Sequence, residues 1–458
     1  MSKRLIAVLA LALVAGLAFS PAYAEVQNVK VSGDITMSGV ARRHFGLSNT
    51  NLDDKSVLKQ NFIMTQTRVR VDADLTDNVT ATVRLLNERI WNGQNDTNSS
   101  GSNSTEIDLD LAYVTLKEFL YSPLTLTVGR QEIKFGNGLI IGKSGAAANT
   151  TNIPTDLSER SAFDAIRATL DYDPLVVDLV YAQIKQDNTT DRNTVSLTGI
   201  NATYAINSKV NVSGYYWFKK DNNTNSSVST SRADKLNTVG ALVSATPIEN
   251  LSTSLEAAYQ FGKNTNTANQ KDHDAWAVQA MADYTFAKVK MTPKIGASYT
   301  YLSGGESNTN ADGTTKNGGW DQMFYDQKLN NIVYAILPMT NMSAFNIKAS
   351  CKPVEDVTIS AVYGYYDVAK ASAGDALLSP SYYNSSTRYL GGTAGNYDAT
   401  YTGKSHLGDA VDATITYDYT EDVQFGLTGG IFRPGDAIKV KNDSKVAQQL
   451  IGSMKVTF

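Results

Sequence analysis

The chain has 458 residues, with 41 Lys and Arg against 45 Asp and Glu and a formal net charge of −4. A net charge this close to zero gives no reason to expect nucleic acid as a partner. The single cysteine, Cys351, excludes an intramolecular disulfide framework and any zinc site built from several cysteines.

The first 24 residues have the features of a secretory signal peptide. Lys3 and Arg4 precede an apolar run from Leu5 to Phe19, and Ala22-Tyr23-Ala24 is a small-x-small cleavage site. We expect cleavage after Ala24, so that residues 25–458 form the mature protein. An uncleaved membrane anchor fits less well, because the run is short and a cleavage site follows it. No later segment is apolar over the length of a membrane helix, so a membrane location requires a closed β-barrel.

Apolar and polar residues alternate along most of the mature chain, as where Val69, Val71 and Ala73 alternate with Arg70 and Asp72. A period of two predicts strands with one apolar face. We expect 18 such strands, and their ranges are 28–45, 62–76, 78–91, 105–119, 123–134, 162–172, 175–187, 193–206, 209–220, 234–246, 250–262, 273–286, 288–303, 343–353, 355–368, 406–419, 422–433 and 445–458.

The lengths of the strands and loops indicate which kind of β protein this is. Most ranges exceed the five or six residues that are usual in globular proteins, and they suit tilted strands that cross a bilayer. Short turns such as Asn207-Ser208 alternate with long polar loops such as 92–104 and 303–320. Outer-membrane barrels have short periplasmic turns and longer extracellular loops. The predicted fold class is therefore all-β, a transmembrane antiparallel up-and-down β-barrel in the outer membrane. A soluble secreted β protein would explain neither feature.

The last strand carries a further signal. Leu450, Met454, Val456 and Phe458 share one face, and the chain ends on an aromatic residue. This resembles the C-terminal signature that the barrel-assembly machinery reads in outer-membrane proteins. We therefore expect that machinery as a partner through Phe458, and outer-membrane lipid around the barrel.

The stretch FGNGLIIGKS (135–144) ends like a phosphate-binding P-loop. The P-loop needs glycine at position 137, where this chain has Asn137, and it needs a helix after the motif. Gly136, Gly138 and Gly142 also miss the spacing of a dinucleotide-binding fingerprint. We expect the stretch to open a long loop after the fifth strand and to bind no nucleotide.

A family resemblance explains the stretch better. VGRQEIKFGNGLIIG (128–142) resembles the signature of the alginate-export-like family of outer-membrane barrels. ERSAFDAIRATLDY (159–172) resembles another family segment, with Ala165 where glycine is usual. YLSGGE (301–306) with WDQMFYDQ (320–327), GDAVDATITYDY (408–419) and IFRPGDA (431–437) extend the resemblance over most of the chain. It implies a porin or channel, with anionic saccharides such as uronates as possible solutes.

Charged residues on the inner parity of the strands are the candidate pore-lining and substrate-contacting residues. The candidates are Lys30, Arg42, Arg68, Arg70, Arg84, Glu88, Asp108, Asp110, Arg130 and Arg167. Simple alternation places Arg130 on the outer face with Val128. Because an arginine facing lipid at mid-bilayer costs about 2–4 kcal/mol, we expect a bulge at Gly129 that turns Arg130 inward. The arginines form either a track that attracts anionic solutes or a salt-bridge lattice neutralised by the acidic residues.

The sequence contains no constellation that indicates catalysis. The three histidines, His44, His273 and His406, lie at strand or loop ends, and none is near another in sequence. We expect no enzyme activity, no catalytic residue, no cofactor and no metal.

The first hypothesis is an outer-membrane porin that passes small hydrophilic, anionic solutes by diffusion through an Arg-lined lumen. A dedicated export channel for an anionic polysaccharide such as alginate is one alternative, and a non-conducting surface adhesin or structural barrel is another. An energy-coupled transporter fits less well, because the first strand leaves no room for an N-terminal plug domain. The sequence leaves open the solute, its direction of travel and the oligomeric state.

Overall fold

The computed structural model describes residues 27–45, 47, 59–91, 107–144, 153–186, 194–222, 233–264, 271–305, 307–309, 315–370, 399–440 and 444–458. The expected signal peptide and its cleavage after Ala24 lie outside these residues.

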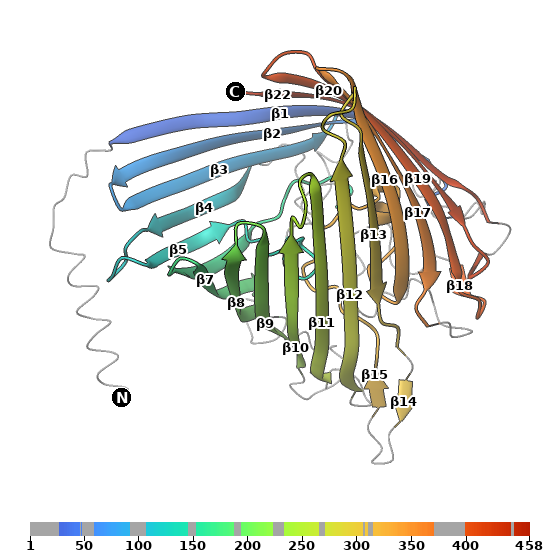
Figure 1. The fold of residues 1–458 in the computed structure, drawn as a ribbon, viewed down its shortest axis with the longest axis horizontal. Coiled ribbons are helices and arrows are strands. Elements are labelled where there is room, and N and C mark those ends of the chain that lie inside the picture. Colours follow the sequence, from blue (N-terminus) through green and yellow to red (C-terminus); the bar gives the residue numbers. More distant parts are fainter. Residues whose placement is uncertain are drawn as a thin grey trace, which may run out of the picture.

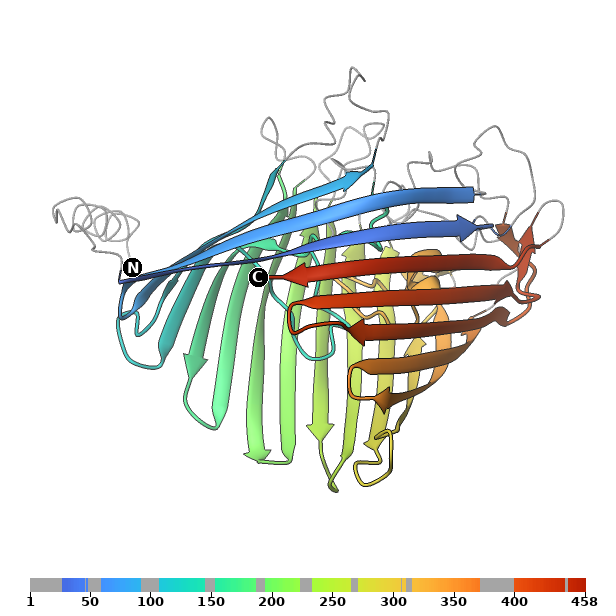
Figure 2. The same ribbon diagram turned by 90° about the horizontal axis from the view of Figure 1, so that it is seen from above.

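The wall of the molecule is a closed antiparallel barrel (Figures 1 and 2). One sheet has 20 strands, of which the three-residue strands β14 and β15 belong to a loop, so 18 form the wall. β1 pairs with β22 and closes the barrel. The wall strands are β1 (Asn28–Arg43), β2 (Lys59–Thr76), β3 (Val79–Ile90), β4 (Asp108–Leu116), β5 (Leu124–Gln131), β6 (Phe163–Asp171), β7 (Leu175–Lys185), β8 (Val195–Asn207), β9 (Val210–Asp221), β10 (Asp234–Ala245), β11 (Leu251–Asn264), β12 (Lys271–Thr285), β13 (Lys294–Leu302), β16 (Met342–Val354), β17 (Val357–Val368), β19 (His406–Asp418), β20 (Val423–Pro434) and β22 (Ala447–Thr457).

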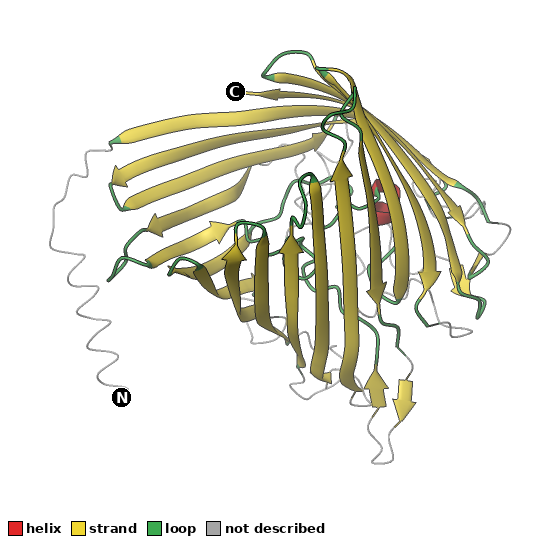
Figure 3. Ribbon diagram, in the orientation of Figure 1, coloured by secondary structure: helices red, strands yellow, loops and turns green. Residues whose placement is uncertain are grey.

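The other described elements lie in the long loops. β14 (Ser307–Thr309) and β15 (Thr315–Asn317) form a hairpin after β13, and β15 pairs in parallel with the start of β12. β18 (Ala399–Tyr401) pairs with β21 (Ile438–Val440). The helix α2 (Asn331–Ile336) is surrounded by the strands of the wall (Figure 3), and five of its six residues are buried. The predicted fold class is confirmed, whereas the alternation did not predict these loop elements.

The exposure of side chains is the reverse of that in a soluble protein. On β11, Leu255 and Tyr259 are 53% and 43% exposed, whereas Glu256 and Gln260 on the inner face are 3% and 0% exposed. An apolar outer face and a polar lumen are what a barrel in a bilayer requires.

In the described part of the chain, no helix is long and apolar enough to cross a membrane.

The largest error in the predicted strands lies between β12 and β13. We expected one strand over 288–303, preceded by a turn at Ala287, but β13 begins only at Lys294. The intervening residues form a turn in which Met291 has a φ of +70°. Pro293, directly before β13, has no N–H to donate to a strand ladder. The apparent alternation of Val289 and Met291 is therefore part of the turn.

Candidate functional site

Two connections fold into the lumen instead of staying outside the barrel. The first inner segment follows β5 and comprises residues 132–144 and 153–162 of the described chain. The second inner segment, residues 318–341, lies between β15 and β16. Ile141 and Phe324 form a parallel β-bridge. The N–H of Phe324 donates to Ile140 O at 3.0 Å, and the N–H of Gly142 donates to Phe324 O at 2.8 Å. The two inner segments therefore form one unit.

An apolar core holds this unit inside the barrel. Leu139 and Ile141 of the first segment and Ile332 and Val333 of the second are at most 1% exposed, and they belong to one cluster with Trp217 of the wall. Burial of such side chains is worth about 1.5–3 kcal/mol each. The lumen is therefore narrowed by a packed structure.

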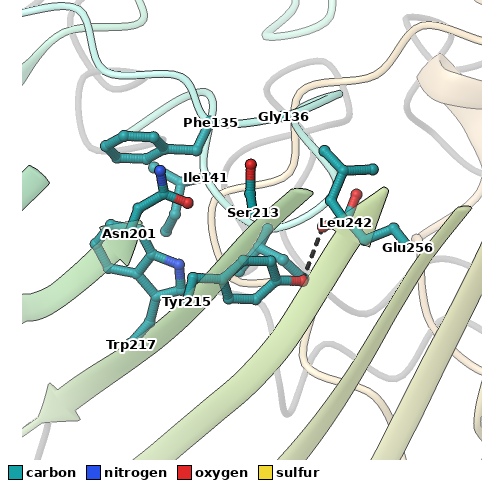
Figure 4. Close-up of a pocket in the computed structure, with 10 residues that line it drawn as sticks. Phe135, Gly136, Ile141, Asn201, Ser213, Tyr215, Trp217, Leu242 and Glu256 are labelled. Carbon is teal, nitrogen blue, oxygen red and sulfur yellow. Dashed lines mark hydrogen bonds between the residues drawn. The ribbon is translucent and has the colours of Figure 1, made fainter. Parts of the chain in front are cut away.

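The first segment packs tightly against the wall strands β8 to β11 (Figure 4). The ring of Phe135 lies 5.2 Å from that of Trp217, and Tyr215 donates a 2.8 Å hydrogen bond to Glu256. Gly136 has a φ of +54°, and a Cβ there would meet Leu242 at 2.7 Å. The remaining cavity of ≈ 10 Å³ is about the least that holds one water. This region is therefore a packing contact and has no room for a solute.

Polar contacts fasten the other end of the first segment to β3. Glu88, which is 1% exposed, accepts hydrogen bonds of 2.8 Å from the Ser158 hydroxyl and from the Glu159 backbone N–H. It also pairs with Arg160 at 3.4 Å, and Arg160 pairs with Asp108 as well. The candidates Glu88 and Asp108 therefore lie on the lumen face and hold the inner segment.

Two further candidates bind the same segment. Arg42, which is 1% exposed, pairs with Asp156. Arg68 pairs with Asp34 of β1 at 2.9 Å and with Glu159 at 3.2 Å. The arginine-rich wall thus serves as the anchor of the first inner segment.

Two other inner arginines, Arg70 and Arg167, are paired within the wall. Arg70 contacts Asp72 at 2.7 Å, and Arg167 contacts Asp178 at 2.8 Å. Lys30 stands opposite Asp72 on the neighbouring strand.

Arg84 contacts two carboxylates, Asp110 and Glu132, each at 2.6 Å. These pairs have the form of a salt-bridge lattice; whether the arginines also act as a track for anions stays a prediction.

The expectation for Arg130 is wrong. β5 and β6 pair without a register shift at Gly129, and Arg130 stands opposite Asp164, which is 61% exposed. Ile166, which shares that face of β6, is 48% exposed. Arg130 therefore lies on the outer face.

A bulge does occur nearby, on β4 instead of β5. The register shift lies between Leu111 and Leu109, so that Asp110 is the extra residue and points into the lumen toward Arg84. Arg130 avoids the cost of facing lipid because it lies near the loop end of the eight-residue β5, where it pairs with Asp164 at 3.1 Å.

The stretch FGNGLIIGKS lies inside the lumen. Lys143 donates to the backbone carbonyls of Thr155 and Ser158, at 3.2 and 2.9 Å. Burial and the nearby charge of Lys328 lower the pKa of the Lys143 amine. Lys143, which stands at the position of a P-loop lysine, therefore holds the first inner segment together.

Sequence reasoning missed the charged residues of the second segment. Asp326 contacts Lys134 at 3.2 Å, and Lys328 lies 5.6 Å from the centre of the Tyr334 ring. The run NIVYAIL (331–337) could have revealed this segment in the sequence. Six of its seven residues are apolar, whereas a loop exposed to solvent is rich in polar residues, glycine and proline.

Within the described ranges, no three His, Cys, Asp or Glu side chains are grouped so that they could hold a metal ion.

Comparison with known proteins decides the family. The sequence model of one family, described as alginate export, matches residues 39–451 of the chain. The chain belongs to the alginate export family. Among curated proteins, none matches the sequence of this family member.

Solved porins share the fold of this alginate export family member. OccK8 (OprE) of Pseudomonas aeruginosa matches with a TM-score of 0.54 and 13% identity, over 94% of this chain and 99% of its own. OccK3 (OpdO) of the same organism gives 0.55 and 10%, over 94% and 97%. OccK2 (OpdF), solved in complex with glucuronate, gives 0.52 and 9%, over 94% and 99%. At these identities the likeness concerns the fold alone. With its closed barrel and its family, the protein is an outer-membrane porin or channel protein.

Proposed function

We propose that this barrel passes small hydrophilic anions by diffusion, and that carboxylated saccharides of the uronate type are its preferred solutes. The observation that carries the proposal is the arrangement of Arg68 and Arg70. They lie two residues apart on the inner face of β2, and their side chains are 17% and 35% exposed.

Each of these guanidinium groups keeps donors for a solute. Arg68 uses Nε and Nη1 for Asp34 and Glu159, and Arg70 uses Nε and Nη2 for Asp72 and Tyr113. Because a guanidinium has five N–H donors, one terminal nitrogen of each has no partner among the described residues. Guanidinium groups bind carboxylates through charge-assisted hydrogen bonds. The inner arginines therefore suit a solute that carries a carboxylate.

The comparisons support the same class of solute. The description of the family is alginate export, and OccK2 (OpdF), which has a similar fold, was solved in complex with glucuronate. Both are carboxylated saccharides. The narrowing of the lumen by the inner segments favours a small solute over a polymer. A non-conducting barrel is the second candidate, because the apolar core of the inner segments fills part of the lumen.

The purified barrel in a planar bilayer is expected to conduct ions, with a reversal potential in a KCl gradient that indicates a preference for chloride. Because charges are screened over about 10 Å at 0.1 M salt and about 3 Å at 1 M, the preference should weaken as salt rises. Glucuronate should reduce the chloride current more than glucose does. Absence of current would favour the non-conducting barrel, and cation preference would contradict the proposed solute class.

A further inference from the structure

The arginine side of the lumen contains more carboxylates than guanidinium groups. Its six inner arginines are Arg42, Arg68, Arg70, Arg84, Arg160 and Arg167. Among the described residues, nine carboxylates lie within ion-pair distance of them: Asp34, Asp72, Glu88, Asp108, Asp110, Glu132, Asp156, Glu159 and Asp178. With all groups ionised, the nine carboxylates outnumber these six arginines together with Lys30, which stands opposite Asp72, and this side is negative. The arginines can orient a carboxylate by hydrogen bonds, but they are no net source of positive potential.

Around the bridge between Ile141 and Phe324, the described side chains of the inner segments have the opposite local balance. Lys134, Lys143 and Lys328 lie on these segments, and the backbone pairing around Phe324 brings the three together. Among the described residues, one carboxylate is in ion-pair contact with this group, namely Asp326, which lies 3.2 Å from Lys134. Neither Lys143 nor Lys328 has an ion-pair partner among the described residues.

No described carboxylate contacts either lysine directly, and Asp326, Glu159 and Glu88 act on Lys143 only from beyond ion-pair distance. Within the described part of the chain, Lys143 donates to the carbonyls of Thr155 and Ser158, and Lys328 lies over the ring of Tyr334. A carbonyl or an aromatic ring solvates an ammonium ion without cancelling its charge. Since low-dielectric walls focus the field in a narrow passage, such charges act strongly on a passing ion.

We propose that Lys134, Lys143 and Lys328 of the inner segments supply the positive charge that selects anions in this barrel. The inference rests on the proposed function and assigns its selectivity to residues other than the arginines. The lysines attract the carboxylate of the solute into the narrowed lumen, and Arg68 and Arg70 then bind it through directional hydrogen bonds.

Reversal potentials of variants test the assignment. In the double variant Lys134→Gln/Lys328→Gln, which leaves the anchoring Lys143 intact, the ratio of chloride to potassium permeability at 0.1 M KCl should fall about three- to tenfold. Lys134→Arg/Lys328→Arg should retain the ratio of the wild type, because charge is kept. Lys209→Gln/Lys404→Gln, which removes two exposed lysines in the turn between β8 and β9 and in the connection before β19, should also retain it.

Three outcomes would overturn the inference in distinguishable ways. If the wild type shows no anion preference, the proposed function fails and the inference fails with it. If the wild type prefers anions but Lys134→Gln/Lys328→Gln does not change the ratio, only the assignment to the lysines is wrong. If Lys294→Gln/Lys348→Gln abolishes the preference instead, the selecting charge lies on the wall, where these two lysines share Asp283 at 4.0 and 2.8 Å.

Discussion

Replacement of Glu88 by alanine is expected to release residues 153–162 from the wall while the barrel stays closed. The substitution removes the acceptor of the Ser158 hydroxyl and of the Glu159 N–H, and it breaks the 3.4 Å ion pair with buried Arg160. Breaking a buried ion pair by removing one partner costs about 3–5 kcal/mol. That energy is lost from the docking of the inner segment, because the β-ladders of β2, β3 and β4 do not depend on the Glu88 side chain.

Limited proteolysis measures this release. Cleavage by trypsin after Arg160 should be at least about a hundredfold faster in Glu88→Ala than in the wild type, because cleavage follows the population of the open form. Single-channel recordings should show a larger and noisier current. Glu249→Ala, at an exposed glutamate in a turn, is the matched control and should leave both unchanged. An unchanged cleavage rate in Glu88→Ala would contradict the anchoring role.

The wall could be predicted because its signal is local. Each strand shows its orientation in neighbouring residues, as Leu255, Glu256, Tyr259 and Gln260 do on β11, because the bilayer requires an apolar outer face along its whole width. A turn that continues the apolar–polar alternation cannot be distinguished from a strand by this pattern. The beginning of β13 was therefore predicted too early. Contact with lipid thus imposes a pattern on the sequence from which the strands can be predicted.

The arrangement inside the lumen depends on contacts between distant residues. Arg42 and Asp156 are 114 positions apart, and no local pattern connects them. The sequence indicated that Arg68 and Arg84 face inward. Their partner Glu159, however, lies on a connection that was expected to be an outer loop, and Glu132 lies just beyond the end of β5, in a stretch that was expected to be strand. For Arg130 the energetic argument assumed mid-bilayer depth, whereas the shortness of β5 places it near the loop end.

The largest effect on conductance should come from removing the second inner segment. Leu302 at the end of β13 pairs directly with Met342 at the start of β16, so residues 303–341 can be replaced by the hairpin turn Asn-Gly. The barrel should still close, because none of the wall pairings uses the deleted residues. Without its bridge to Phe324, the first segment also loses its support at Ile141.

We expect the single-channel conductance of this variant to rise about three- to tenfold, since an 18-stranded barrel without a constriction leaves an aqueous channel. Anion preference should also decrease, because Lys328 is removed and the lumen is wider. Deleting only residues 307–317, which carry β14 and β15 but none of the second inner segment, is the matched control and should leave conductance unchanged. Both variants should keep the heat-modifiable gel migration of a folded barrel. If the Asn-Gly variant folds but conducts no better than the wild type, residues 318–341 do not limit the pore, and the constriction must lie in the first inner segment alone.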